Sequence, residues 1–190
     1  MTASRGTARF GLLVPFTNTN LEPDMVLMRP PGVSLHWARL GGYDEDEIPD
    51  EDQMQGLGAA DLDDPLRLLS GVKPDVVFYG CTSATLTHGP AFDTALAERI
   101  RSQSGAATVT AAGGLVAACR ALGIARIGFA SPYVRTINRM AVDFLAREGI
   151  PTLQPLHTGA ALTTHGPRAP TPHPVPEPDQ RAAPPGCIAL

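Results

Sequence analysis

The chain has few cysteines and no long apolar run, and both shortages exclude classes of protein. It has three cysteines in 190 residues, at positions 81, 119 and 187. An odd number at such wide spacing argues against a disulfide framework and favours a reducing compartment, so we expect a cytoplasmic protein. The uncharged run 105–119 is shorter than the ~20 residues that a membrane helix needs, so we expect no membrane partner.

Positive charge is also scarce. Fifteen Lys and Arg against 19 Asp and Glu give a formal net charge of −4, which argues against a nucleic-acid partner. No expected strand is followed by a Gly-x-Gly-x-x-Gly motif or a phosphate loop, which argues against a nucleotide cofactor. The apolar run 10–16 is short and interrupted by Pro15, and no small-residue cleavage site follows it. We therefore interpret it as a first strand and not as a signal peptide.

Short apolar runs alternate with amphipathic segments over the first 150 residues. Hydrophobic residues make up 43% of the chain and charged residues 18%, which is enough for a globular core. The apolar runs predict strands at 10–16, 33–40, 75–79, 107–110 and 126–130. Helical spacing predicts helices at 22–28, 65–71, from Pro90, from Gly113-Gly114 and around 137–145. This alternation is typical of an α/β fold, a flavodoxin-like parallel sheet flanked by helices.

Two of these helices have apolar stripes that identify their expected buried faces. The stripe of the helix from Pro90 is Phe92, Ala95, Leu96 and Ile100, and that of the helix from Gly113 is Leu115, Ala118, Cys119 and Leu122. The second stripe places Cys119 on a packed face, so we interpret this cysteine as structural.

Acidic residues concentrate in one segment. Ten of the 19 lie between Tyr43 and Asp64, without an ordered spacing of ligands. Such a run is usually a solvated connection, so we expect no metal site there.

The stretch from Asp75 to Gly89 places a cysteine where a thiol could do chemistry. The strand expected at 75–79 is stopped by Gly80, so Cys81 follows its carboxyl end, the edge at which open α/β sheets bind ligands. Thr82 and Ser83 add two hydroxyls, and the helix expected to begin at Pro90 would favour a thiolate. The alternative is that Cys81 is a small buried residue that closes a strand.

The first expected strand ends in the polar loop Thr17-Asn18-Thr19-Asn20. Amide and hydroxyl donors can bind a carboxylate, but the same residue types also cap helices. Both interpretations of Asn18 stay open from its position alone.

The sequence changes character after Ile150. Ten of the 19 prolines lie in 151–190, which predicts a disordered tail that cannot continue a parallel sheet. The abrupt change favours a truncation or a reading-frame change near residue 150 over a natural extension. The two alternative frames of the coding DNA would test this hypothesis.

Several stretches resemble maleate cis–trans isomerases and their relatives in the aspartate/glutamate racemase superfamily. They are residues 10–24, residues 79–89 with the sequence Gly-Cys-Thr-Ser, the stretch 121–133 and the helix of Asn138. Arylmalonate decarboxylase and a protein of ectoine breakdown are other members. The resemblance runs from Arg9 to Ile150.

This resemblance implies two α/β lobes, with a small carboxylate between them and no cofactor. We place the first lobe at 1–112, the start of the second at 113–150 and the tail at 151–190. Cys81 matches the catalytic cysteine of the first lobe. The positions that match substrate-binding residues are Asn18, Thr82, Ser83 and Tyr133.

The implied activity is cis–trans isomerisation of a small dicarboxylate, maleate to fumarate, through a cysteine thiolate. Amino-acid racemisation, arylmalonate decarboxylation and a non-catalytic carboxylate-binding lobe are the alternatives. Decarboxylation is disfavoured because arylmalonate decarboxylase lacks a cysteine at the position of Cys81. The strand with the second-lobe cysteine should follow Ile150, and we do not assign that role to Cys187. The sequence therefore predicts a chain that is inactive or needs another chain, as in a homo-oligomer, to complete its cleft.

Overall fold

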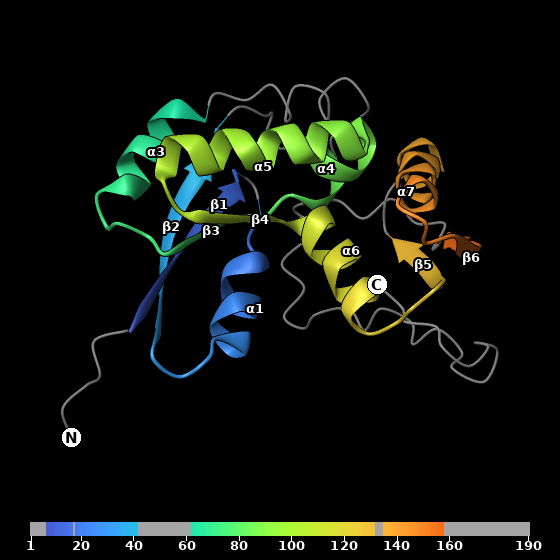
Figure 1. The fold of residues 1–190 in the computed structure, drawn as a ribbon, viewed down its shortest axis with the longest axis horizontal. Coiled ribbons are helices and arrows are strands. Elements are labelled where there is room, and N and C mark those ends of the chain that lie inside the picture. Colours follow the sequence, from blue (N-terminus) through green and yellow to red (C-terminus); the bar gives the residue numbers. More distant parts are fainter. Residues whose placement is uncertain (1–6, 17, 42–61, 132–134, 158–190) are drawn as a thin grey trace, which may run out of the picture.

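Strands and helices alternate along the chain, as Figure 1 shows. The computed structural model describes residues 7–16, 18–41, 62–131 and 135–157. The strands are β1 (Ala8–Pro15), β2 (Val33–Leu40), β3 (Val76–Tyr79), β4 (Ala107–Thr110), β5 (Ile127–Ser131) and β6 (Thr152–His157). The helices are α1 (Leu21–Met28), α3 (Asp63–Ser70), α4 (Thr82–His88), α5 (Pro90–Ser104), α6 (Ala111–Ala121) and α7 (Arg135–Arg147). The predicted α/β fold with parallel strands is confirmed.

Four strands form one parallel sheet in the order β2-β1-β3-β4. Leu13 pairs with Tyr79, and Tyr79 pairs with Thr110, so the carboxyl ends of these strands meet at one edge. The loops that follow β1, β3 and β4 therefore emerge next to each other.

Helices α3 and α5 cover one face of this sheet (Figure 1). The space between them holds the first hydrophobic cluster: Leu13, Leu40, Leu62, Leu66, Leu69, Val77, Tyr79, Cys81, Ala84, Leu96, Ile100, Ala106 and Ile137. Gly11 lets α3 approach closely, because a Cβ there would lie 2.7 Å from Cδ2 of Leu69. Burial of these side chains is the main stabilisation of the edge that carries Cys81.

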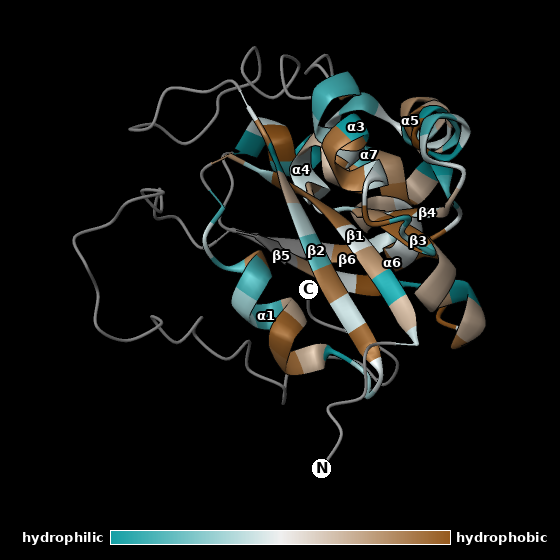
Figure 2. Ribbon diagram, turned by 90° about the vertical axis from the view of Figure 1, so that its left-hand side faces the viewer, coloured by the Kyte–Doolittle hydropathy of each residue, from teal (hydrophilic) through white to brown (hydrophobic). Residues whose placement is uncertain are grey.

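The other face of the sheet has a thinner cover, from α1 and α6 (Figures 1 and 2). Leu12 and Val14 of the central strand are fully buried, but Trp37 and Phe78, which lie in register with Leu12, are half-buried. Helix α1 buries none of its residues, and Leu27 is 85% exposed.

Strands β5 and β6 form a separate parallel pair. The second hydrophobic cluster lies beside them: Leu86, Ala112, Val116, Cys119, Ile127, Phe129, Ala141, Phe144, Leu145 and Ile150. A lobe boundary at residue 112 stays a prediction, because helices α4 and α7 contribute residues to both clusters.

Strand β6 corrects the expectation that no strand follows Ile150. Within the described residues β6 pairs with β5 alone, and proline is tolerated in such an edge strand. The pairing also shifts register: Gly128 pairs with Leu153 and Ala130 with Leu156, which leaves Pro155 in the irregular part. The predicted disordered tail otherwise lies outside the described residues.

The helices differ from the expectations in two respects. Residues 82–88 form α4 instead of a loop, and α6 begins at Ala111, where Oγ1 of Thr110 accepts the N–H of Gly113 at 2.9 Å. On α6, Val116 replaces Ala118 and Leu122 on the buried face, since Leu122 is 69% exposed. Cys119 is buried there, as predicted.

On α5, the stripe from Leu96 to Ile100 is buried as predicted. Ala95 is exposed, and Asp93 takes a place on the buried face instead. Residues three and four positions apart lie on the same face of a helix. Phe92, four residues before Leu96, and Asp93, three residues before it, could therefore both join the stripe.

No helix within the described ranges is long and apolar enough to cross a membrane.

Candidate functional site at the carboxyl edge of the sheet

The site begins where β3 ends. The N–H of Gly80 donates to the carbonyl of Leu13 at 2.9 Å and so joins the end of β3 to β1. A Cβ at residue 80 would overlap the side chain of Leu21 from α1. Glycine therefore lets α1 and the two strands close tightly just before Cys81.

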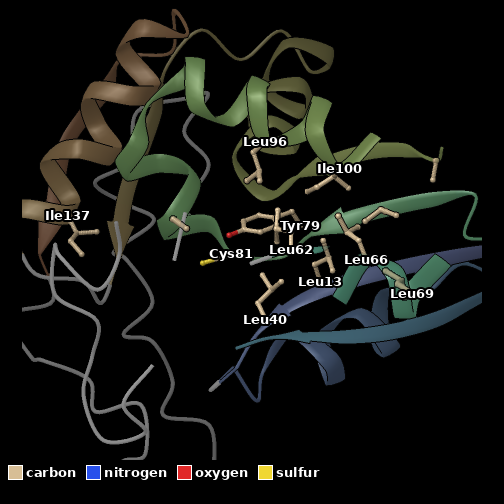
Figure 3. Packing of buried hydrophobic residues seen from close by; sticks show 13 residues of the cluster. Leu13, Leu40, Leu62, Leu66, Leu69, Tyr79, Cys81, Leu96, Ile100 and Ile137 are labelled. Atoms are coloured by element: carbon tan, nitrogen blue, oxygen red, sulfur yellow. The ribbon is translucent and has the colours of Figure 1, made fainter. Parts of the chain in front are cut away.

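Cys81 occupies the N-cap position of α4 and lies at the end of the first hydrophobic cluster. Its side chain is 5% exposed, and its Sγ lies 3.7 Å from Oγ of Ser83. In the view of Figure 3, Cys81 lies between Ile137 of α7 and the leucines around the first sheet. The backbone at this position is fixed by Thr85, whose hydroxyl donates to the carbonyl of Cys81 at 3.2 Å.

The electrostatics of Cys81 correct the expectation of a favoured thiolate. Burial raises the pKa of the Cys81 thiol, because the anion loses its hydration. The N–H of Ala84 and the hydroxyl of Ser83 lower this pKa, but burial is the larger effect. Within this chain Cys81 is therefore a neutral thiol near pH 7.

The two hydroxyls after Cys81 have different environments. Thr82 is exposed, and Ser83 is buried at 4% exposure with its Oγ beside the sulfur. Thr82 can thus meet a ligand from solvent, whereas Ser83 can act only on a group that enters next to the thiol.

Asn18 lies on the loop after β1, at the same edge as Cys81. Its Oδ1 accepts the N–H groups of Asn20 at 2.9 Å and Leu21 at 2.8 Å. The capping interpretation of Asn18 therefore has direct support for the oxygen. The amide Nδ2 carries two further donors that this capping does not use, so carboxylate binding stays a prediction.

Sequence reasoning missed a buried carboxyl group behind this edge. Asp93 is 7% exposed, and among the residues that the structure describes no hydrogen-bond partner contacts its Oδ1. Burial raises the pKa of Asp93, a hydrogen bond from Thr110 opposes that effect, and the charge of Glu148 adds to it. The three- and seven-residue spacing to Leu96 and Ile100 was the signal that could have placed Asp93 on the buried face.

Two residues singled out from the sequence, Tyr133 and Cys187, lie outside the described residues. The described residues contain no group of three or more His, Cys, Asp or Glu side chains that could hold a metal ion. The structure thus brings the Asn18 loop and the Cys81 segment to one edge.

The chain is an α/β protein with a parallel sheet, and a buried cysteine followed by two hydroxyl side chains lies at the carboxyl end of β3. The family is shown by comparison with known proteins, because the family model of arylmalonate decarboxylase, Amdase, matches residues 11–159. The chain belongs to this family, within the superfamily of maleate isomerases and aspartate/glutamate racemases.

Individual relatives agree with this assignment. The chain is 30% identical over 155 residues to maleate isomerase of Nocardia farcinica, covering 76% of this chain and 59% of that enzyme. It is 29% identical over 141 residues to arylmalonate decarboxylase of Bordetella bronchiseptica, covering 73% and 52%. The chain thus spans less than two thirds of the length of either relative.

A solved structure is similar as well. It is a cysteine-to-serine mutant of Nocardia farcinica maleate cis–trans isomerase with a covalently bound succinylcysteine intermediate. The TM-score is 0.70 at 25% identity, over 81% of this chain and 64% of that one.

Proposed function

We propose that this chain carries the first cysteine region of a cofactor-independent cis–trans isomerase for a small dicarboxylate, with maleate and fumarate as the pair. The observation that carries the proposal is the placement of Cys81 at the edge that also holds the Asn18 loop. The similarity to maleate isomerases, one of them solved with a succinylcysteine, supports the substrate and the cysteine chemistry.

The groups that this chain contributes to the reaction are the cysteine and donors for two carboxylates. The Cys81 thiolate adds to one alkene carbon, and the electron pair of the C=C bond moves to the other carbon and its carboxylate. Rotation about the resulting single bond follows. The electron pair then returns, the C–S bond breaks, and the trans alkene leaves with the thiolate restored.

Each named side chain has a role in this scheme. The Nδ2 of Asn18 and the hydroxyl of Thr82 bind substrate carboxylates, and Ser83 donates to the sulfur or to the developing enolate oxygen. Tyr133 is a further proposed carboxylate donor. Because burial raises the pKa of Cys81, the chain reacts slowly near pH 7 and faster as the pH rises.

The test is to incubate the full chain with maleate at several pH values and to follow fumarate by proton NMR. We expect fumarate from the unmodified chain and none from Cys81→Ala. Cys119→Ala is the matched control, since Cys119 is equally buried but lies on α6. Turnover that persists in Cys81→Ala would remove this thiol from the reaction.

A second candidate function is a carboxylate-binding lobe without turnover. It is favoured by the raised pKa of Cys81 and by the share of the relatives that the chain spans, 59% for the Nocardia enzyme. Maleate that shifts NMR signals of Asn18 and Thr82 without fumarate formation would support it over the isomerase.

A further inference from the structure

Arg39 connects the end of β2 to the loop that holds Asn18. Its Nη1 donates to three carbonyl oxygens of that loop: Pro15 at 3.2 Å, Phe16 at 3.3 Å and Asn18 at 2.5 Å. Its Nη2 forms an ion pair with Oε1 of Glu22 at 2.8 Å. One guanidinium therefore fixes both the turn after β1 and the first turn of α1.

The contacts use both terminal nitrogens of the guanidinium, Nη1 for the loop carbonyls and Nη2 for Glu22. The guanidinium is planar and presents several N–H donors in a rigid fork, so it can hold carbonyls and a carboxylate at the same time. A lysine ammonium keeps the charge but concentrates its donors at one point. The loop also has a backbone bond of its own, from the N–H of Asn18 to the carbonyl of Pro15 at 3.0 Å.

The Asn18 side chain is fixed at its oxygen end. Oδ1 accepts the N–H groups of Asn20 and Leu21, which leaves the Nδ2 donors for a ligand. An amide that offers only donors binds anions and not cations. The selectivity of this loop for a carboxylate thus depends on the backbone that Arg39 holds through the carbonyl of Asn18.

We propose that Arg39 is a positioning residue that holds the Asn18 loop in the arrangement that binds a substrate carboxylate. This inference rests on the proposed function. Arg39 is already paired with Glu22 and bonded to the loop carbonyls, so it acts through the geometry of the loop and not by direct attraction of the substrate. A lysine at position 39, which keeps the positive charge but lacks the planar guanidinium, therefore does not preserve binding of the carboxylate.

The first measurement needs no ligand. Hydrogen exchange of the backbone N–H groups of Asn20 and Leu21 reports whether Oδ1 of Asn18 still holds them. We expect faster exchange at both positions in Arg39→Lys and Arg39→Gln than in the unmodified chain. Arg101→Gln is the matched control, because Arg101 pairs with Glu98 on the surface of α5. Unchanged exchange in both Arg39 variants would overturn the inference.

The second measurement is maleate affinity by NMR titration of the Asn18 side-chain amide, with Asn18→Ala to assign the signal. We expect both Arg39 variants to bind about tenfold more weakly, on the order of one lost charge-assisted contact, and Arg101→Gln to bind normally. A purely structural residue would lower the melting temperature and leave affinity unchanged below it, which would contradict the proposal. Rescue of affinity by Arg39→Lys would also contradict it.

These results separate the inference from the function on which it rests. Weak binding in the Arg39 variants, with no fumarate from the unmodified chain, would reject the isomerase and keep the positioning role. Normal binding in the variants, with fumarate from the unmodified chain, would keep the isomerase and reject the positioning role. No effect of maleate on Asn18 in the unmodified chain would reject the positioning role, and fumarate formation would still decide the isomerase.

Discussion

Each of the two hydrophobic clusters contains one buried cysteine, and the two surroundings differ. Cys81 lies at the end of β3 beside Ser83, whereas Cys119 lies in the last turn of α6 with apolar neighbours on its buried face. Their exposures are 5% and 2%, so burial does not distinguish them. What distinguishes Cys81 is its place at the carboxyl edge of the sheet, next to hydroxyls and the first turn of a helix.

The comparison also shows where the clusters join. Helix α4 contributes Ala84 to the first cluster and Leu86 to the second, and α7 contributes Ile137 to the first and Phe144 to the second. Cys81 therefore lies next to the boundary between the two clusters, whereas Cys119 lies within the second cluster. Packing changes in either cluster can reach Cys81 through α4 and α7.

The largest expected effect tests whether the two clusters unfold together. Phe144→Ala removes a 2% exposed ring from the second cluster and should cost about 3 to 5 kcal/mol. Trp37, the one tryptophan of the chain, lies on β2 and reports on the first sheet. We expect its fluorescence to show a lower midpoint in urea, because α4 and α7 couple the clusters.

One outcome would contradict this coupling of the clusters. An unchanged Trp37 midpoint with a new, separate transition by circular dichroism would show that the clusters unfold independently. Leu122→Ala is the control, since Leu122 is 69% exposed and its loss should change the free energy of unfolding by less than about 0.5 kcal/mol.

The next effect concerns the polar contact between α5 and α6. Thr110→Val removes the hydroxyl that caps Gly113 and that donates to Asp93, so about 1 to 2 kcal/mol of stability should be lost. Thr108→Val, on the same strand, removes a half-buried hydroxyl that donates to Ala106 and should cost less. Chemical unfolding of both variants measures the difference. Equal losses of unfolding free energy in Thr110→Val and Thr108→Val would show that the contact between α5 and α6 stabilises the chain no more than an ordinary side-chain hydrogen bond.

A pH dependence should accompany the buried carboxyl group of the same contact. Burial raises the pKa of Asp93 in the folded chain above its unfolded value of about 3.9. The stability that this group contributes is therefore complete below about pH 4 and is lost as the pH rises through the folded pKa. Each tenfold ratio of the two acid constants corresponds to about 1.4 kcal/mol.

The measurement is the free energy of unfolding of the unmodified chain and Asp93→Asn at several pH values. The free energy of unfolding of Asp93→Asn minus that of the unmodified chain should increase as the pH rises from about 4 and should then level off. Asp143→Asn, at an exposed position of α7, serves as control. A difference between Asp93→Asn and the unmodified chain that does not change with pH would contradict the raised pKa.

The smallest effect lies on the surface, away from both clusters. Arg101 and Glu98 form an ion pair one helical turn apart on α5, with both side chains about 60% exposed (61% and 59%). Solvent screens such pairs, so Arg101→Gln should leave the urea midpoint nearly unchanged, and added salt should reduce any difference further. A clear drop of the midpoint would show that this surface pair contributes to the stability of α5.

Much of the fold and part of the site could be predicted from the sequence. Strands 33–40 and 107–110 have the predicted bounds, and Cys81 follows β3 as expected, because apolar runs and glycine stops are local signals. Helix α4 was missed since its Thr-rich sequence has low helix propensity and forms a helix through contacts with α5, α6 and α7. Strand β6 was missed because only its edge position makes Pro155 acceptable.

The parallel α/β fold, the order of most of its elements and the place of Cys81 after a strand followed from the sequence alone, because hydrophobic periodicity and chain breakers act over a few residues. Only the tertiary structure decided that burial raises the pKa of Cys81, that Asp93 is enclosed near Thr110, and that Arg39 holds the Asn18 loop. These properties depend on groups that are distant along the chain. Desolvation and hydrogen bonding between such groups exist only after the helices have packed on the sheet.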